Sequence, residues 1–361
     1  MKAAVCRAFG EPLVIEELEL DPPGRDEVHV KLAACAICHS DIIYMEGGWG
    51  GALPAVYGHE AAGIVAAVGP GVDDLAPGDH VLVTLIRSCG HCYYCAQGNQ
   101  HICETQFPLD REGKLRDGSG KPVLQALRTG GFAEEVVVER SQVAAIPSDV
   151  PFDSASLLSC GVITGLGAVV NTARVPQGAG VVVIGTGGVG LNSVQGAAIS
   201  GAYPILAIDL DDRKLEAAKR FGATHGINPR NEDAAARVRE LTGGRGADYA
   251  FVTVGTSRAA EQAVGLIRKA GTMVMVGIPP TGDMASIEIG NIANDSQVIL
   301  GSKMGSTRLA VDIPKLVTLY KEGRLKLDEL ISGRYPLDRI NEAVASVKRG
   351  EALRNVIVFA T

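Results

Sequence analysis

The sequence has little of what a membrane-spanning or secreted protein needs. None of its apolar runs approaches the roughly 20 residues that a transmembrane helix requires. Acidic residues interrupt its N-terminal region, which therefore lacks the apolar core and cleavage site of a secretory signal. We expect a soluble, cytoplasmic protein without a membrane partner, in a reducing compartment where disulfides are disfavoured.

The chain also lacks an excess of positive charge, and its aromatic side chains are scarce. The net charge is -7 and aromatic residues make up 4% of the chain. A protein that binds the phosphate backbone needs a basic face, so nucleic acid is not an expected partner. Glycine, in contrast, occurs 45 times. This abundance favours tight turns and cofactor loops in which backbone segments approach closely.

A chain of 361 residues is long for one hydrophobic core, so two domains are expected. Up to about residue 150, short β-rich runs are separated by Gly, Pro and Asp. These runs are Val28–Ala34, Gly63–Val68, His80–Ile86 and Glu135–Val138. The polar segment 104–128 is interpreted as an ordered loop.

From about residue 180, buried strands alternate with helices, which predicts a parallel sheet wrapped by helices. The predicted strands are 181–185, 204–209, 249–255, 272–278 and 298–304, and helices are predicted at 212–223 and 258–271. A helix at 313–325 and a strand at 353–359 leave this repeat. The C-terminus is therefore expected to return to the first domain.

Half of the eight cysteines lie in the stretch CGHCYYCAQGNQHIC, residues 89–103. Cys89, Cys92, Cys95 and Cys103 have a spacing that suits four thiolates around one zinc ion. A closed thiolate shell leaves no position for chemistry, so this zinc is predicted to be structural. Two disulfides and an iron–sulfur cluster are the alternatives, of which the reducing compartment opposes the first.

A sparser set comprises Cys38, His59 and Cys160. Two thiolates and one imidazole are the ligands that leave the fourth position of zinc open to water or substrate. The alternative is three unrelated core residues. The nearby Asp41 either orients the His59 ring or caps the helix that follows it.

The stretch VVVIGTGGVG joins a buried strand to the pattern G-x-G-x-x-G, with a helix-forming segment behind it. This context predicts a dinucleotide site whose pyrophosphate lies at the helix N-terminus. Asp209 ends the next strand and would bind the adenosine ribose, favouring NAD over NADP. Alternatively, Asp209 caps the helix that follows. The predicted loop residues are Gly185, Gly187, Gly188, Val189 and Gly190.

Taken together, these motifs closely resemble the zinc-dependent medium-chain alcohol dehydrogenases, in particular their class I/III-like branch. The resemblance covers essentially the whole chain and rests on CHSD (38–41), GHEAAG (58–63), the four-cysteine lobe, SCGVITGLGAVVNTA (159–173), GTGGVG (185–190), Asp209 with Lys214, and LRNVIVF (353–359). It implies an α/β protein with a GroES-like, mainly-β catalytic domain, residues 1–161 and 304–361, which carries the zinc lobe 89–103. Residues 162–303 would form a Rossmann coenzyme domain with a doubly wound parallel sheet.

The resemblance also implies residue roles. Two zinc ions per chain and NAD are expected as cofactors, and an alcohol or aldehyde as substrate. Cys38, His59 and Cys160 would bind the catalytic zinc, with Glu60 as an occasional fourth ligand, and the lobe would bind the structural zinc. Ser40 would take the proton of the alcohol while hydride passes reversibly to NAD. His39 and Arg354 would contact the pyrophosphate, Thr164 the nicotinamide, and Asp209 with Lys214 the ribose; otherwise Lys214 is a solvated helix residue and Arg354 a surface charge.

Two positions depart from the family pattern. Ile43 stands where many relatives have the histidine that completes the proton relay, and Phe107 stands where the glutathione-dependent formaldehyde dehydrogenases have an arginine for their anionic substrate. The second departure disfavours a thiol adduct. Trp49, Leu85 and Phe107 fall at or near substrate-pocket positions and favour an apolar or aromatic alcohol, unless they are ordinary core residues.

Other readings of the same chain remain open. A nicotinoprotein would hold its coenzyme tightly, and a non-catalytic zinc-stabilised relative would keep the fold without activity. Most of the segment between Cys103 and Gly131 is retained in this chain, whereas tetrameric microbial members of the family that it resembles shorten it. The resemblance therefore favours a homodimer over the alternative homotetramer.

Overall fold

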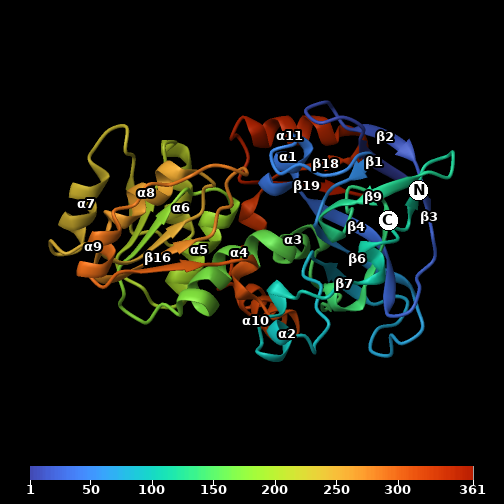
Figure 1. The fold of residues 1–361 in the computed structure, drawn as a ribbon, viewed down its shortest axis with the longest axis horizontal. Coiled ribbons are helices and arrows are strands. Elements are labelled where there is room, and N and C mark those ends of the chain that lie inside the picture. The colour runs from blue at the N-terminus through green and yellow to red at the C-terminus, as the bar shows by residue number, and fades with distance from the viewer. Residues whose placement is uncertain (361) are drawn as a thin grey trace. The chain divides into compact units, whose positions relative to one another are not determined.

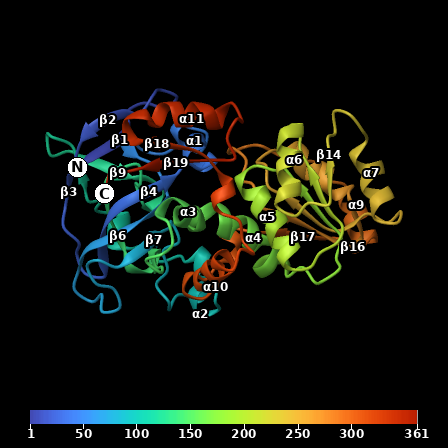
Figure 2. The ribbon, with the colours of Figure 1, turned by 180° about the vertical axis from the view of Figure 1, so that it is seen from behind.

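The computed structural model describes residues 1–360. They form two compact units: residues 1–160 together with the chain from Arg308 onward, and Gly161–Thr307. Figure 1 shows the chain coloured from its N-terminus to its C-terminus, and Figure 2 shows it from behind.

The unit 161–307 is built on one six-stranded sheet with the order β14-β13-β12-β15-β16-β17. All neighbouring pairs are parallel. Numbered within the unit, the order is 3-2-1-4-5-6, which is typical of dinucleotide-binding sheets. The strands are β12 Val181–Ile184, β13 Ile205–Ile208, β14 His225–Ile227, β15 Ala247–Val252, β16 Ile267–Met275 and β17 Val298–Gly301.

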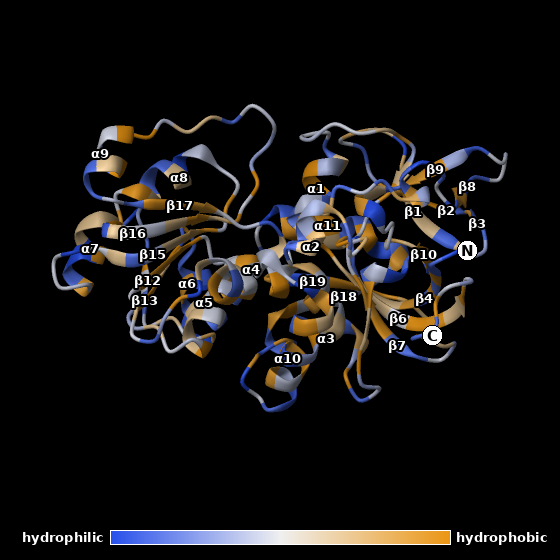
Figure 3. Cartoon of the chain, turned by 60° about the horizontal axis from the view of Figure 1, so that its bottom comes forward, coloured by the Kyte–Doolittle hydropathy of each residue, from blue (hydrophilic) through white to orange (hydrophobic). Residues whose placement is uncertain are grey.

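Helices cover this sheet because its central strands are apolar on both faces. Every residue of β12 and β13 is buried, as expected for a parallel sheet. One face of the sheet shares a hydrophobic cluster with α7 and α8. The helix α5 packs against β12 and β13, and its buried side chains do not belong to that cluster. Figure 3 shows the apolar strands and the more polar outer helices. The helices are α4 Ile163–Gly167, α5 Gly188–Ile199, α6 Asp212–Arg220, α7 Ala234–Leu241, α8 Ser257–Val264 and α9 Ile289–Asn294.

The predicted helix at 258–271 is wrong in its second half. The helix α8 ends at Val264 with Gly265 as its C-cap, and β16 already begins at Ile267. Gly265 keeps right-handed backbone angles, with φ −75° and ψ −9°, so it ends the helix through the low helix propensity of glycine. The apolar residues that follow it therefore belong to a strand.

The other unit is mainly β and contains two sheets. One has the order β11-β7-β6-β4-β19-β18, with β10 also paired to β4, and the other the order β2-β1-β5-β9-β8-β3. The C-terminal strand β19 joins the N-terminal strand β4 in antiparallel fashion. Its strands are β1 Lys2–Cys6, β2 Val14–Glu17, β3 Glu19–Leu20, β4 Glu27–Ala36, β5 Ala55–Val56, β6 Glu60–Val68, β7 His80–Val83, β8 Leu115–Arg116, β9 Pro122–Gln125, β10 Glu135–Glu139, β11 Val143–Ala145, β18 Ile331–Pro336 and β19 Arg354–Val358. Its helices are α1 His39–Met45, α2 Tyr93–Ala96, α3 Phe152–Leu157, α10 Leu309–Lys321 and α11 Ile340–Lys348.

The segment 104–128, which was expected to be a loop, contains two short strands. The strands β8 and β9 pair with each other and continue the second sheet through β5 and β3.

The helical run Phe152–Ala173 is long and apolar enough to cross a membrane, contrary to the expectation that no such run exists. Because 83% of its apolar window is buried inside the protein, it has the character of a core helix.

Candidate active site

Four metal-ligating side chains meet inside the mainly-β unit. The ligand atoms of Cys38, His59, Glu60 and Cys160 lie within 4.8 Å of one another, and all four residues are buried. Cys38 is the N-cap of α1, and Cys160 lies in the π-helical turn that follows α3. Glu60 begins β6, and His59 directly precedes it. Two thiolates and an imidazole suit zinc with an open fourth position.

Asp41 holds this cluster in place from behind. Its Oδ1 accepts hydrogen bonds from His59 Nδ1 at 2.9 Å and from the Gly58 amide at 3.0 Å. Its Oδ2 accepts a hydrogen bond from the Cys38 amide at 3.1 Å as part of a capping box. Asp41 therefore orients the ring. It also supports the start of α1 from the third helical position, while the N-cap itself is Cys38.

The opposite nitrogen of the ring is left for a metal. His59 Nε2 is buried and has no hydrogen-bond partner among the residues that the structure describes. Because Asp41 accepts from Nδ1, Nε2 carries a lone pair that faces the cysteines, which is how zinc-binding histidines are held. The donor set and this orphaned nitrogen fit a zinc ion.

The two thiols of the cluster are strongly unequal. A hydrogen bond with Cys160 holds the pKa of Cys38 well below its ordinary value, helped by the nearby His59 ring. The same bond, together with burial, raises the pKa of Cys160 well above the ordinary value. The cluster thus favours a thiolate at Cys38, the form that binds metal.

Glu60 is paired with a residue that reaches it from the C-terminal strand. Arg354 begins β19 and forms an ion pair with Glu60, and both side chains are almost completely buried. Burial raises the pKa of Glu60 to about 7, although the Arg354 charge opposes the rise. Arg354 is therefore not the solvent-exposed surface charge that the sequence left as an alternative.

The lobe cysteines also converge. The sulfur atoms of Cys89, Cys92, Cys95 and Cys103 lie within 4.8 Å of one another, with 3.9 Å between those of Cys92 and Cys103. Three of the sulfurs accept backbone amide hydrogen bonds, at 3.2 to 3.5 Å. All eight cysteines are free. Two disulfides are thus excluded in this structure, and the set fits the four-thiolate zinc site.

The glycine loop of the other unit has the geometry that a coenzyme requires. Gly185 has a φ of +89°, and a Cβ at Gly190 would lie 1.8 Å from the Gly185 carbonyl oxygen. A Cβ at Gly187 would meet no protein atom within 4 Å. The first and third glycines thus allow the turn and the close helix packing, while the second leaves open space for a pyrophosphate at the N-terminus of α5.

Asp209 is anchored to the same loop. Its Oδ2 accepts hydrogen bonds from the Thr186 amide at 2.8 Å and from the Thr186 hydroxyl at 3.0 Å. The alternative that Asp209 caps the next helix is wrong, because Asp211 is the N-cap and accepts from the Arg213 amide at 2.9 Å. Thr186 was missed in the sequence, although it lies inside the glycine motif.

The remaining predicted residues occupy varied environments. His39 is exposed and Ser40 half-buried in the first turn of α1, while Thr164 is buried on α4 and Lys214 half-buried on α6. Trp49 packs edge-on against Tyr44, with ring centroids 4.9 Å apart, and Leu85 is half-buried.

Phe107 is buried beneath a residue that the sequence did not single out. The Arg87 guanidinium lies 5.5 Å from the centre of the Phe107 ring. Arg87 is fixed by Gln142 at 2.7 Å and by Asp110 at 2.8 Å, and Asp110 also accepts from the Phe107 amide. Only the three-dimensional structure reveals this network, because its members are scattered along the chain.

We predict that Asp41→Asn lowers zinc affinity by about 10- to 100-fold, the usual effect of removing a carboxylate that orients a metal-binding histidine. Metal analysis after dialysis against a zinc buffer measures this loss. Asp79→Asn is the matched control, because Asp79 caps a surface turn through the Ala76 amide. Equal zinc retention in both variants would contradict the role given to Asp41.

Known protein families match both units. The family described as alcohol dehydrogenase GroES-like domain matches residues 24–148, and the family described as zinc-binding dehydrogenase matches residues 188–322. The chain is 36% identical over 369 residues to alcohol dehydrogenase class-P of Arabidopsis thaliana, covering 99% of this chain and 97% of that protein. It is 38% identical over 368 residues to the NDMA-dependent alcohol dehydrogenase of Amycolatopsis methanolica, covering 99% of both.

Solved structures agree with these sequence matches. The benzyl alcohol dehydrogenase of Acinetobacter calcoaceticus superposes with a TM-score of 0.93 at 33% identity, covering 99% of each chain. An alcohol dehydrogenase zinc-binding domain protein from Burkholderia ambifaria gives a TM-score of 0.95 at 36% identity, covering 100% of this chain and 99% of that one.

Proposed function

The chain belongs to the zinc-dependent medium-chain alcohol dehydrogenase family, and on that premise we propose that it oxidises apolar or aromatic alcohols reversibly with freely exchanging NAD. The observation that carries the proposal is the buried cluster of Cys38, His59 and Cys160, in which Asp41 directs the orphaned His59 nitrogen at the two sulfurs. The chemistry supplied by the bound groups is Lewis-acid polarisation of the alcohol oxygen by zinc and acceptance of hydride by NAD.

The protein's own side chains prepare this reaction. Cys38, His59 and Cys160 would hold the metal, and Asp41 fixes the ring that would otherwise rotate. Ser40, two residues after the first ligand, takes the hydroxyl proton in our proposal. Because Ile43 cannot accept a proton, the relay ends without a histidine at that position.

Substrate choice is proposed from the apolar character of the predicted pocket. Trp49 stacks edge-on with Tyr44, and Phe107 replaces the arginine that an anionic glutathione adduct would need. The similarity to a benzyl alcohol dehydrogenase supports an aromatic substrate for this chain.

Trp49→Ala is expected to reduce kcat/KM for benzyl alcohol relative to ethanol by about tenfold, the value of a lost aromatic contact of roughly 1.4 kcal/mol. Initial rates across aliphatic and aromatic alcohols measure the ratio. Tyr93→Ala is the matched control, because Tyr93 is 69% exposed on the zinc lobe. Unchanged relative rates in Trp49→Ala would refute the pocket assignment.

A second candidate is a nicotinoprotein of the same family, favoured by the 38% identity to an NDMA-dependent alcohol dehydrogenase. The two candidates differ in whether the coenzyme leaves the protein. Turnover that requires added NAD supports the exchanging enzyme. A nucleotide that remains bound through gel filtration, with turnover only when an artificial acceptor is present, supports the second candidate.

A homodimer in the cytoplasm is proposed as the working form. The outer strand β17 has no neighbour on one side within the described chain, and Val298 and Ile299 on it are exposed, as are the nearby Met284 and Ile289. An apolar unpaired edge is a surface that a second copy of the same strand can cover. The eight free cysteines agree with a reducing compartment.

Light scattering is expected to report two subunits for the purified protein, and Ile299→Lys is expected to release monomers because a charge would be buried against the partner strand. Val14→Lys is the matched control, since Val14 is similarly exposed on the other unit. Four subunits, or a dimer that survives Ile299→Lys, would contradict this assembly.

A further inference from the structure

A pocket of about 830 Å³ opens in the coenzyme unit, at the end of the strands that is opposite the glycine loop. Gly180, Pro204 and Gly246 immediately precede β12, β13 and β15, so the pocket lies at the amino ends of the strands. The glycine loop follows the carboxyl end of β12. The pocket is therefore separate from the place where a coenzyme binds a sheet of this type. Its volume lies within the range usual for small-molecule sites.

The floor of the pocket holds a fixed guanidinium. Asp248 accepts a hydrogen bond from the Gly180 amide at 2.6 Å, and Arg268 Nε donates to the same carboxylate at 2.6 Å. Arg268 Nη1 donates to the Lys269 carbonyl oxygen, also at 2.6 Å. These bonds use Nε and Nη1, so the guanidinium is held in one orientation with Nη2 left to donate to a ligand.

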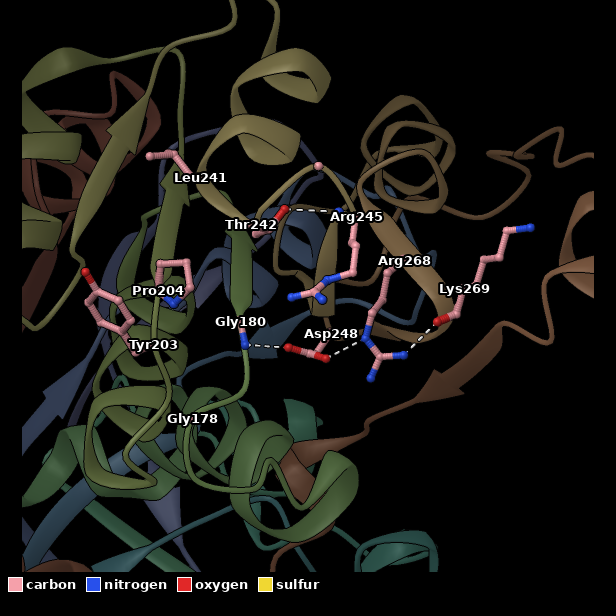
Figure 4. Close-up of a pocket in the computed structure, with 12 residues that line it drawn as sticks. Gly178, Gly180, Tyr203, Pro204, Leu241, Thr242, Arg245, Asp248, Arg268 and Lys269 are labelled. Carbon is pink, nitrogen blue, oxygen red and sulfur yellow. Dashed lines mark hydrogen bonds and ion pairs between the residues drawn. The ribbon is translucent and has the colours of Figure 1, made fainter.

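A second guanidinium faces the same space without a partner. Arg245 is exposed, and its side chain forms no hydrogen bond or ion pair within residues 1–360. Figure 4 shows it directed from its loop toward Gly180 and Asp248 on the pocket floor. Asp248 balances one of the two arginines, and Lys269 is balanced by Asp295 at 3.4 Å. The pocket thus carries one net positive charge.

Part of the lining is apolar. Tyr203, Pro204 and Leu241 line the pocket, and Tyr203 is 67% exposed. Figure 4 shows Tyr203 on the other side of Gly180 and Asp248 from Arg268. One net charge matches a monoanion better than a dianionic phosphate, and a paired guanidinium set is suited to the two oxygens of a carboxylate.

We propose that this pocket binds a small organic monocarboxylate, whose carboxylate lies between Arg245 and Arg268. Nothing in the proposal depends on the alcohol that the enzyme oxidises, because every lining residue lies outside the zinc cluster and the glycine loop.

Isothermal titration of the zinc-loaded full-length enzyme with benzoate tests the proposal. We expect saturable binding that weakens about tenfold in Arg245→Ala and is largely restored in Arg245→Lys, since a charge-assisted hydrogen bond contributes roughly 1.5 kcal/mol. Benzamide, which keeps the ring without the charge, should bind at least tenfold more weakly than benzoate.

The controls separate this pocket from other sites. Arg258→Ala removes an exposed arginine of α8 outside the pocket and should leave benzoate binding unchanged. All variants alter exposed side chains, and equal melting temperatures establish that they fold alike. Absence of benzoate binding, or binding that Arg245→Ala leaves unchanged, would overturn the proposal.

Discussion

Replacing Cys160 with serine is expected to remove one of the two zinc ions per chain and to lower kcat/KM for alcohol oxidation by roughly 10³-fold or more. Loss of Lewis-acid stabilisation costs several kcal/mol of the barrier, and each 1.36 kcal/mol is tenfold in rate. Cys160 is one of only three side chains in the cluster that carry sulfur or imidazole. Metal analysis and initial rates on the same preparation measure both effects.

Cys103→Ser is the matched comparison. It removes a thiolate from the lobe, where the four sulfurs lie within 4.8 Å, and leaves the buried cluster intact. We expect loss of the other zinc and a lower melting temperature, while the folded fraction keeps its activity. If Cys160→Ser retained two zinc ions and normal rates, the buried cluster would not be the catalytic site.

Asp209→Gly is expected to lower the preference for NAD over NADP by about 10²-fold in kcat/KM. Two hydrogen bonds from the ribose hydroxyls to a carboxylate account for roughly 3 kcal/mol, and the same negative charge repels a 2'-phosphate. Rates with each coenzyme at one alcohol concentration give the ratio.

Thr186→Ala tests the position of the Asp209 carboxylate separately from its charge. The Thr186 hydroxyl donates to Asp209 at 3.0 Å, so its loss loosens the carboxylate without removing its charge. We expect weaker binding of NAD with the preference over NADP retained. A preference that is unchanged in Asp209→Gly would show that another group selects the coenzyme.

The sequence predicted what short motifs specify. The fold class, the use of zinc and NAD, and the alcohol dehydrogenase activity are confirmed by the family matches and the similar proteins. These properties depend on residues whose spacing is fixed locally, such as the Cys89 lobe and the glycines that follow β12. Such motifs can be recognised in a sequence because one turn of the chain brings residues that are close in sequence close together in space.

Some contacts between residues far apart in the sequence were not predicted. The return of the C-terminus to the first domain was expected, but the ion pair between Glu60 and Arg354 that follows from it was not. The strands β8 and β9 are two and four residues long, too short for a clear alternating pattern, and they are stabilised by pairing with other strands. Tertiary pairing decided their structure, as it commonly does for short β segments.

NADH formation from benzyl alcohol by the zinc-loaded protein tests the zinc site and the coenzyme preference together, when it is measured before chelator treatment, after it, and after zinc is restored, with NAD and separately with NADP. We expect turnover with NAD far above that with NADP, loss of turnover on zinc removal, and recovery when zinc is returned. Turnover that persists after the buried site has lost its zinc would contradict the role given to Cys38, His59 and Cys160.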